Sequence, residues 1–248
     1  MARDGLPQLD GNTALFLDVD GTLVDIAPVP DAVIVPPGLG DVLRRLRAGL
    51  DGALALVSGR PLAGIDALFA PLRLPAAGQH GAELRLRGDT APIALARDPA
   101  LDILAERAME IAVERPGVLV EDKGLSIAIH YRLAPQYREE LHRLAAELVA
   151  GSGAGIELLP VRMGVELKSR AISKGSAIEW FMCAPPFHGR VPVFVGDDRT
   201  DEFGFAAVLK LGGQAIRVGD LGPSLAPLRL ASPHAVRDWL AAASATLR

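Results

Sequence analysis

Residues 13–24, which read T-A-L-F-L-D-V-D-G-T-L-V, constrain the fold of this chain more than any other stretch. They open with an unbroken run of apolar and β-branched residues, 13–17, which is typical of a strand buried on both faces. The run ends at two carboxylates, Asp18 and Asp20, and a glycine then turns the chain. Because open α/β sheets bind ligands at the carboxyl ends of their strands, this acidic pair predicts a ligand site.

The acidic pair also predicts a cation. Carboxylates this close repel each other when both are ionised, and a hard divalent ion such as Mg²⁺ is their usual neutralising partner. The alternative interpretation is an acidic turn, since Asp-Gly is a common turn dipeptide. The complete string D-V-D-G-T-L-V is far rarer by chance than Asp-Gly alone, which favours the cation site.

Length and charge limit the classes of protein that remain. The chain has 248 residues, enough for one large domain or two smaller ones. Its formal net charge of −4, without a Lys/Arg run, argues against a nucleic-acid or anionic-membrane partner. A single cysteine excludes an internal disulfide. No apolar segment resembles a signal peptide or a membrane span, so we expect a cytoplasmic protein and, by default, a monomer.

Strand and helix patterns alternate on both sides of a central segment. After the opening strand, Pro37 and Pro61 each begin a helical pattern, and a short buried strand is predicted at 53–57 between them. The alternation returns towards the C-terminus, with a helix at 174–183, a strand at 191–195, a helix ending near 209, a strand at 214–218 and a helix at 232–243. This pattern predicts an α/β fold with a doubly wound parallel sheet.

The central segment has a different character. Short extended stretches predict antiparallel strands at 83–87, 93–96, 118–121, 125–131 and 156–159, and amphipathic helices are predicted near 99–113 and 135–149. We therefore expect a core of residues 1–82 and 168–248, interrupted by an inserted α+β domain at residues 83–167.

Several polar side chains follow predicted core strands or begin helices. Parallel strands bring such positions to one edge of the sheet. The side chains expected to converge there are Asp18, Asp20, Ser58, Lys174, Asp197 and Asp198. Carboxylates that hold Mg²⁺, one carboxylate that attacks, and a hydroxyl and a lysine that hold a dianion are what phosphoryl transfer requires. Taken singly, each position has a structural interpretation as a helix start or a solvated charge.

These motifs resemble those of a known superfamily. D-V-D-G-T-L-V, the serine after the second strand, the downstream lysine and G-D-D-R-T-D-E are similar to the four motifs of haloacid dehalogenase phosphatases. Further stretches resemble the trehalose-6-phosphate phosphatases: V-S-G-R at 57–60, G-Q-H-G-A-E at 78–83, E-D-K-G-L-S at 121–126, H-Y-R at 130–132 and V-E-L-K at 165–168. The resemblance runs from about residue 14 to about residue 219 and implies a Rossmann-like catalytic core whose inserted cap domain sets substrate specificity.

The resemblance implies a role for each acidic residue of the core. Asp18 would be the nucleophile that forms an aspartyl-phosphate. Asp20 would protonate the leaving sugar oxygen and then deprotonate water. Mg²⁺ would bind Asp18, the backbone carbonyl of Asp20 and Asp197, with Asp198 as a direct or water-mediated ligand or as an orienting group.

Other side chains would hold the substrate. Ser58 and Lys174 would bind phosphoryl oxygens, and Thr22 would add a hydrogen bond. Arg60 and His80, in V-S-G-R and G-Q-H-G-A-E, are further candidate substrate-binding residues. For His80, a hinge at the crossing into the insert and simple packing are alternatives.

Within the insert, the resemblance implies that the sugar meets Glu121, Lys123 and Glu166, with Arg132 as a further candidate. Glu121 and Lys123 are two residues apart in an extended segment and therefore share a face. The alternative for each is a solvated strand face. Arg162 departs from the resemblance because it stands where lysine is usual, and it lacks the point-donor geometry of lysine.

The function implied is Mg²⁺-dependent hydrolysis of trehalose 6-phosphate to trehalose and phosphate, the last step of trehalose biosynthesis. The same core would serve a phosphatase for sucrose phosphate or glucosylglycerol phosphate, a phosphomutase, or a non-catalytic sugar-phosphate sensor. The intact acidic pair argues against a sensor, because a binding protein needs neither a nucleophile nor an acid. Only the insert distinguishes one sugar phosphate from another.

Overall fold

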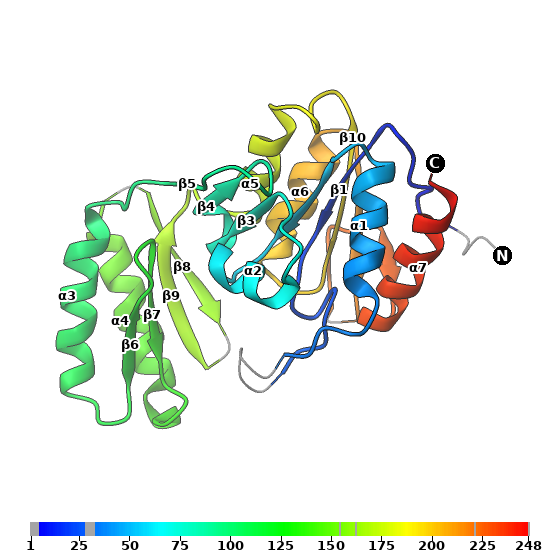
Figure 1. The fold of residues 1–248 in the computed structure, drawn as a ribbon. Helices are drawn as coiled ribbons and strands as arrows, with labels where there is room; N and C mark the ends of the chain where they lie inside the picture. The colour runs from blue at the N-terminus through cyan, green and yellow to red at the C-terminus, as the bar shows by residue number, and fades with distance from the viewer. Residues whose placement is uncertain (1–4, 28–32, 154, 162, 221, 248) are drawn as a thin grey trace. The chain divides into compact units, whose positions relative to one another are not determined.

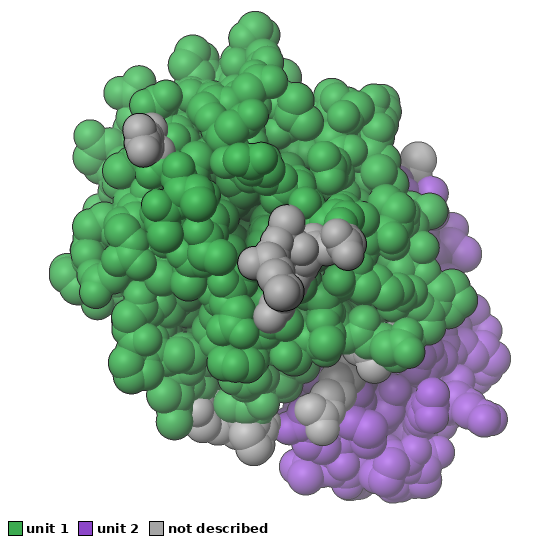
Figure 2. All heavy atoms as spheres, turned by 90° about the vertical axis from the view of Figure 1, so that its right-hand side faces the viewer, with its two compact units in different colours: residues 1–94, 173–248 green, residues 95–172 purple. Residues whose placement is uncertain are grey.

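The structure, a computed structural model, describes residues 5–27, 33–153, 155–161, 163–220 and 222–247. It comprises two compact units, coloured separately in Figure 2: unit 1 takes in residues 1–94 and 173–248, and unit 2 takes in residues 95–172. Unit 2 thus begins and ends later than the insert expected at 83–167. It begins later because β4 (Glu83–Arg85) pairs with β3 in the sheet of unit 1 and β5 (Ile93–Ala94) pairs with β4. It ends later because β9 (Gly164–Ser169) continues beyond residue 167 in the sheet of unit 2.

The sheet of unit 1 has eight strands in the order β12-β11-β10-β1-β2-β3-β4-β5 (Figure 1). Neighbours are parallel from β12 to β3, and β4 and β5 extend one edge antiparallel. The parallel strands are β1 Thr13–Leu17, β2 Leu54–Val57, β3 Ala76–Gly78, β10 Val191–Gly196, β11 Gln214–Val218 and β12 Leu228–Leu230. The predicted doubly wound parallel sheet is confirmed, and the antiparallel edge is an addition to it.

Helices cover both faces of this sheet. They are α1 Leu39–Gly49, α2 Leu62–Phe69, α5 Lys174–Met182, α6 Asp201–Lys210 and α7 Pro233–Thr246. Helix α1 packs beside α7, and α5 packs beside α6 (Figure 1). The β1–α1–β2 and β10–α6–β11 connections run in opposite directions along the sheet, so right-handed crossovers put α1 and α6 on opposite faces. Strand β1 is therefore buried on both sides, and residues 14–17 expose 0% of their surface.

Unit 2 has its own sheet and its own hydrophobic core. Its strands β6 Leu119–Asp122, β7 Ser126–His130, β8 Ile156–Val161 and β9 Gly164–Ser169 form an antiparallel sheet in the order β6-β7-β9-β8. Helices α3 (Ala100–Val113) and α4 (Arg138–Gly151) supply apolar side chains to a core that includes Ile127, Ile129, Val165 and Leu167. Because side chains alternate along a strand, the residues between these positions point to the other face of the sheet.

No helix in the described residues combines the length and the apolar character that crossing a bilayer requires.

Candidate active site

The acidic residues of unit 1 lie where the strand order changes direction. In the sheet, β1 lies between β2 and β10. The connection from β1 leads to β2 on one side, whereas the connection from β10 leads to β11 on the other side. Open α/β sheets bind ligands at such a switch point. The two strands end level with each other, since Leu17 pairs with Val195 and the N–H of Asp18 donates to the Val195 carbonyl at 3.0 Å. Asp18 and Asp197 therefore emerge side by side.

Buried carboxylates form the centre of the site. Asp18, Asp197 and Asp201 are all buried, and one oxygen from each lies within 4.8 Å of the others. Gly21 makes room for this packing, because a Cβ there would lie 2.1 Å from Asp197 Oδ2. Its φ of +81° is also a left-handed value that favours glycine. The glycine of the opening motif is thus a steric requirement of the cluster.

Lys174 brings positive charge into this cluster. It is the first residue of α5, and its Nζ donates to Asp18 Oδ1 at 2.7 Å and to Asp201 Oδ1 at 2.6 Å. A capping box fixes the helix start, since Ser173 and Ser176 each accept the other's backbone N–H. Burial lowers the pKa of Lys174, but Asp18 and Asp201 outweigh this effect and raise it above its ordinary value. Lys174 therefore stays charged.

Asp201 belongs to the cluster, although no sequence motif had assigned it a role. It begins α6, has no exposed surface, and accepts the backbone N–H groups of Asp197 and Asp198 at 2.9 Å each. Gly196 permits this approach, since a Cβ there would lie 2.3 Å from Asp201 Cγ. The available signal was its spacing of four residues from Asp197. From the sequence, however, an acidic residue in the first turn of a helix is already explained by its favourable interaction with the helix dipole. The spacing alone therefore did not single out Asp201 as a member of the site.

Burial raises the pKa values of three carboxylates in the cluster, because Lys174 offsets only part of their negative charge. It raises the pKa of Asp18 to about 7, with Lys174 opposing the shift and Asp197 and Asp198 adding to it. It likewise raises the pKa of Asp197 to about 7, reinforced by Asp201 and Asp198. The pKa of Asp201 also lies well above its ordinary value, chiefly through burial. A divalent cation would favour the ionised forms, and an all-oxygen donor set fits a hard ion such as Mg²⁺.

Asp198 and Thr22 border the cluster. Asp198 is exposed, and its Oδ1 accepts from the N–H of Thr200 at 2.8 Å and from its Oγ1–H at 2.6 Å. Although part of the residue is exposed, the surrounding protein partly desolvates the carboxyl group and raises its pKa, and Lys174 and the Thr200 hydrogen bond outweigh this effect, so that the pKa of Asp198 lies below its ordinary value. Thr22 is fully buried and donates from Oγ1 to Asp197 Oδ1 at 3.4 Å. Asp198 therefore contacts the cluster that it was predicted to join, and Thr22, predicted to add a hydrogen bond to the substrate, contacts it as well.

The carboxylate of Asp20 is paired with an arginine. Arg60 donates from Nε to Asp20 Oδ2 and from Nη2 to Asp20 Oδ1, each at 2.7 Å. The Asp20 side chain is 35% exposed and the Arg60 side chain 15% exposed. Two parallel charge-assisted bonds of this kind are the strongest form of arginine–carboxylate contact.

Ser58 and His80 lie next to this pair. Ser58 is buried, its Oγ accepts the backbone N–H of Arg60 at 3.1 Å, and its carbonyl accepts the N–H of His80 at 2.9 Å. The His80 ring packs against Gly59, where a Cβ would lie 2.7 Å from Cε1. His80 also has a φ of +59°, a strained value for a residue other than glycine. Strain of this kind is typical of functional positions.

The candidate residues of unit 2 share one face of its sheet. Glu121, Ala128 and Glu166 are aligned across β6, β7 and β9, on the face opposite the hydrophobic core. Lys123 Nζ lies 3.5 Å from Glu166 Oε2, and Glu121 Oε2 lies 3.1 Å from His130 Nε2. Glu166 is buried, whereas Glu121 is exposed. Carboxylates and an ammonium thus meet on one surface, as sugar recognition requires.

Arg132 is the remaining candidate in this part of the chain, and Arg162 is the position at which the sequence departs from the resemblance. Arg132 is exposed just beyond the end of β7. Arg162 lies outside the described residues.

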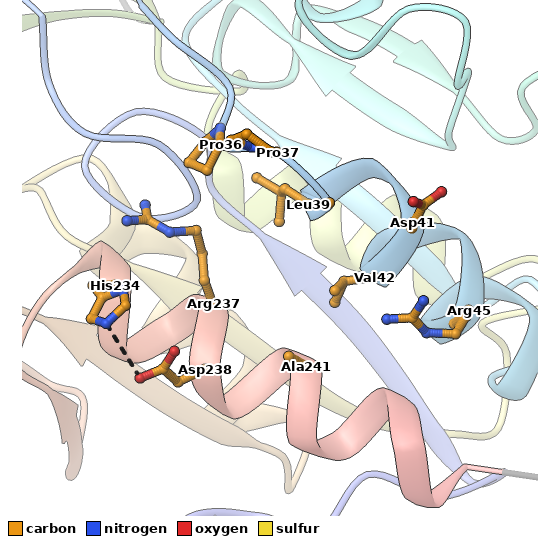
Figure 3. Close-up of a pocket in the computed structure, with 11 residues that line it drawn as sticks. Pro36, Pro37, Leu39, Asp41, Val42, Arg45, His234, Arg237, Asp238 and Ala241 are labelled. Atoms are coloured by element: carbon orange, nitrogen blue, oxygen red, sulfur yellow. Dashed lines mark ion pairs between the residues drawn. The ribbon is translucent and has the colours of Figure 1, made fainter.

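Unit 1 also has a pocket away from these residues, and none of the described residues that line it is a predicted site residue. It has a volume of about 470 Å³ and opens between the start of α1 and the start of α7 (Figure 3). Side chains from both helices border it, among them Leu39, Val42, Arg45, His234, Arg237 and Asp238. Its ion pair, His234 with Asp238 at 3.7 Å, joins residues of one helix. It is thus separate from the acidic cluster.

The sequence matches a family profile described as trehalose-phosphatase over residues 16–232. That segment contains the acidic cluster of unit 1 and all of unit 2. The chain belongs to the trehalose-phosphatase family. It is accordingly a hydrolase of phosphoric monoesters, and the resemblance found in its motifs is confirmed.

Individual relatives of this trehalose-phosphatase agree in sequence and in fold. The chain is 43% identical over 239 residues to the trehalose-6-phosphate phosphatase of Escherichia coli (strain K12), covering 94% of this chain and 87% of the relative. The solved C-terminal domain of a Candida albicans trehalose-6-phosphate phosphatase has the same fold at 19% identity, with a TM-score of 0.80 and coverage of 95% and 93%. A Bacteroides thetaiotaomicron phosphatase of the haloalkanoate (HAD) superfamily aligns at 17% identity with a TM-score of 0.64, over 98% and 99% of the two chains.

Proposed function

We propose that this trehalose-phosphatase hydrolyses trehalose 6-phosphate to trehalose and phosphate, through an aspartyl-phosphate on Asp18 and with Mg²⁺ as cofactor. The observation that carries the proposal is the buried Asp18–Lys174–Asp201 chain, with Asp197 within reach, at the switch point of the sheet. Phosphoryl transfer depends mainly on positioning and charge neutralisation, and this cluster supplies both. The name of the Escherichia coli relative supports the choice of substrate.

The proposed reaction has two steps. In the first, an oxygen of Asp18 attacks phosphorus, the phosphorus–oxygen bond to the sugar breaks, and Asp20 gives its proton to the departing sugar oxygen. In the second, water attacks the phosphorus, Asp20 takes a proton from that water, and the bond to Asp18 breaks to release phosphate. Asp20 ends the cycle protonated and Asp18 ends it free.

Lys174 and its neighbours prepare the nucleophile and the phosphoryl group. The bond from Lys174 to one oxygen of Asp18 fixes the carboxylate, while Asp201 holds the ammonium in place. Ser58, Lys174 and Thr22 bind phosphoryl oxygens in the proposal, and removing one such donor typically costs about a hundredfold in turnover.

The oxygen ligands of Asp18 and Asp197, with the backbone carbonyl of Asp20, would hold Mg²⁺, and Asp198 would bind it directly or through water. The bound ion supplies positive charge that lets Asp18 and the phosphate dianion approach each other. The raised pKa values of Asp18 and Asp197 support this assignment, because a bound cation would favour the ionised form of both carboxylates at neutral pH.

Unit 2 would provide sugar specificity. Glu121, Lys123 and Glu166 offer acceptors and donors for sugar hydroxyls, and Arg132 is a further candidate. Their common sheet face and the Lys123–Glu166 contact support this role. The division into a catalytic core and a specificity cap, the monomeric state and the cytoplasmic location stay predictions.

A phosphate-release assay tests the substrate. Wild-type enzyme is given trehalose 6-phosphate, sucrose 6-phosphate or glucose 6-phosphate, each with Mg²⁺ and with EDTA. We expect release to be at least about tenfold faster from trehalose 6-phosphate than from the others, and to stop in EDTA. Equal rates on the three sugars would contradict the substrate assignment, and full activity in EDTA would contradict the cofactor. Conversion to a phosphate isomer instead of free phosphate would favour a phosphomutase.

A further inference from the structure

The Arg60–Asp20 pair points to a role for Arg60 that its motif did not indicate. We infer that Arg60 is a positioning residue: it holds the carboxylate of Asp20 in place for proton transfer and acts through Asp20 instead of through the substrate. The inference rests on the proposed function, because the acid–base role of Asp20 belongs to that proposal.

The geometry suits a clamp on Asp20. Both carboxylate oxygens accept from the same guanidinium at 2.7 Å, so the side chain cannot rotate without breaking two charge-assisted bonds. A partly exposed aspartate would otherwise sample several rotamers. Each carboxylate oxygen has about two acceptor sites, and Arg60 occupies one on each. An acceptor site on each oxygen is thus left for the reacting proton.

Arg60 is itself held in place by the backbone around it. Its N–H donates to Ser58 Oγ at 3.1 Å, and its carbonyl accepts the N–H of Gln79 at 2.9 Å. Pro61, the next residue, is the N-cap of α2 and restricts the backbone of Arg60. The loop that bears a proposed phosphoryl ligand, Ser58, therefore also carries the residue that orients the acid.

A leaving-group comparison separates this role from phosphate binding. A sugar alkoxide needs a proton to leave, whereas p-nitrophenolate leaves without one. Loss of Arg60 should therefore slow the first step, formation of the aspartyl-phosphate, for trehalose 6-phosphate and spare it for p-nitrophenyl phosphate, whereas the second step, in which Asp20 activates water, is common to both substrates. General acid catalysis is worth about a hundredfold or more, so we expect Arg60→Ala to slow the release of trehalose in a single turnover about a hundredfold, with little change in KM. We expect its single-turnover release of p-nitrophenolate to stay within about threefold of wild type.

Three further variants sharpen the comparison. Arg60→Lys keeps the charge but cannot form the fork, so we expect about a tenfold loss on the sugar phosphate. In the double variant Arg60→Ala/Asp20→Asn, kcat should be no lower than in Asp20→Asn alone, because both changes remove the same function. Arg44→Ala removes an exposed arginine that pairs with Asp41 and should leave both activities unchanged.

Several outcomes would overturn the inference. Equal losses of the single-turnover rate on both substrates, or a large rise in KM with kcat retained, would mean that Arg60 binds the phosphoryl group itself. Multiplicative losses in the double variant would mean that Arg60 does not act through Asp20. A fall in melting temperature with equal losses would indicate a merely structural role. If trehalose 6-phosphate is not a substrate of the wild type, the proposed function fails, and the same comparison can be made with glucose 6-phosphate.

Discussion

The buried carboxylates Asp18 and Asp197 should make stability depend on pH when no cation is bound. Burial raises both pKa values to about 7, whereas the unfolded chain releases these protons near 3.8. The folded protein therefore binds more protons than the unfolded chain between these values. The contribution of these two groups to the free energy of unfolding is therefore fully present below about pH 4 and is lost as pH rises through about 7. Between these values it falls by about 1 kcal/mol per pH unit for each group.

Thermal unfolding of EDTA-treated protein across this pH range measures the effect. We expect the melting temperature to fall as pH rises from about 5 to about 8, and the fall to be smaller in Asp197→Asn, which removes one titrating group. Excess Mg²⁺ should reduce the fall, because it binds the ionised carboxylates. A melting temperature that rises over this range would show that the cluster does not hold these protons.

Gly21 allows a second test on a single residue. A Cβ at Gly21 would lie 2.1 Å from Asp197 Oδ2, whereas Gly38, with a nearly equal φ of +82°, has no atom of the described residues within 4 Å of its Cβ position. Gly21→Ala and Gly38→Ala should both lose about 1 kcal/mol to left-handed backbone strain. Only Gly21→Ala should also lower kcat/KM, by about tenfold or more, because it displaces a ligand. Equal activity in the two variants would count against the role of Asp197.

At the scale of elements, an ion pair between buried Arg85 and partly exposed Asp66 connects β4 to α2 of unit 1. Arg85 is 1% exposed, donates twice to Asp66 of α2 at 2.7 Å and 2.6 Å, and also bonds the Leu74 carbonyl. Arg85→Ala leaves Asp66 and that carbonyl without this partner, so we expect a loss of about 3 kcal/mol in urea unfolding. Arg73 contacts the same Asp66 from a half-exposed position, and Arg73→Ala should cost less than about 1 kcal/mol. Comparable losses would contradict the assignment of β4 to this unit.

The elements that the sequence predicted well are those with a strong local pattern. Strand β1 has the predicted bounds Thr13–Leu17, because a short apolar run that ends in an acidic turn is typical of a central strand of a parallel sheet. Strands β4 and β5 are predicted as strands but assigned to the insert. In the structure, β5 pairs with β4, and β4 pairs with β3, which is only three residues long and reads A-A-G. A pairing partner is a tertiary property that local periodicity does not contain.

The same distinction holds for the site. Motif spacing predicted the convergence of Asp18, Lys174 and Asp197, because strand ends in a parallel sheet share one edge. It did not predict Asp201 as a partner of Lys174 or Arg60 as a partner of Asp20. The first contact joins residues 27 positions apart in the sequence, and the second joins residues 40 positions apart. Each side chain could be explained by its neighbours in the sequence, and its partner is evident only from the folded structure.

At the scale of the whole molecule, the two units have separate hydrophobic cores and separate sets of candidate residues. Among the described residues, the hydrogen bonds that Lys174 donates to Asp18 and Asp201, and that the N–H of Asp197 donates to Asp201, all join residues of unit 1. The chemistry should therefore depend on unit 1 and the choice of sugar on unit 2. Substitutions at Glu121 or Glu166 should raise KM for trehalose 6-phosphate by about tenfold while p-nitrophenyl phosphate turnover is retained; parallel losses on both substrates would contradict this division.

The most direct test of the account is detection of the covalent intermediate. Enzyme with Mg²⁺ and trehalose 6-phosphate is quenched in acid within the first turnover, and the peptide that contains Asp18 is examined by mass spectrometry. The account predicts phosphate on Asp18 in the wild type, none in Asp18→Asn, and no phosphate release by that variant despite an unchanged fold. Full turnover without phosphorylated Asp18, or substantial activity in Asp18→Asn, would contradict it.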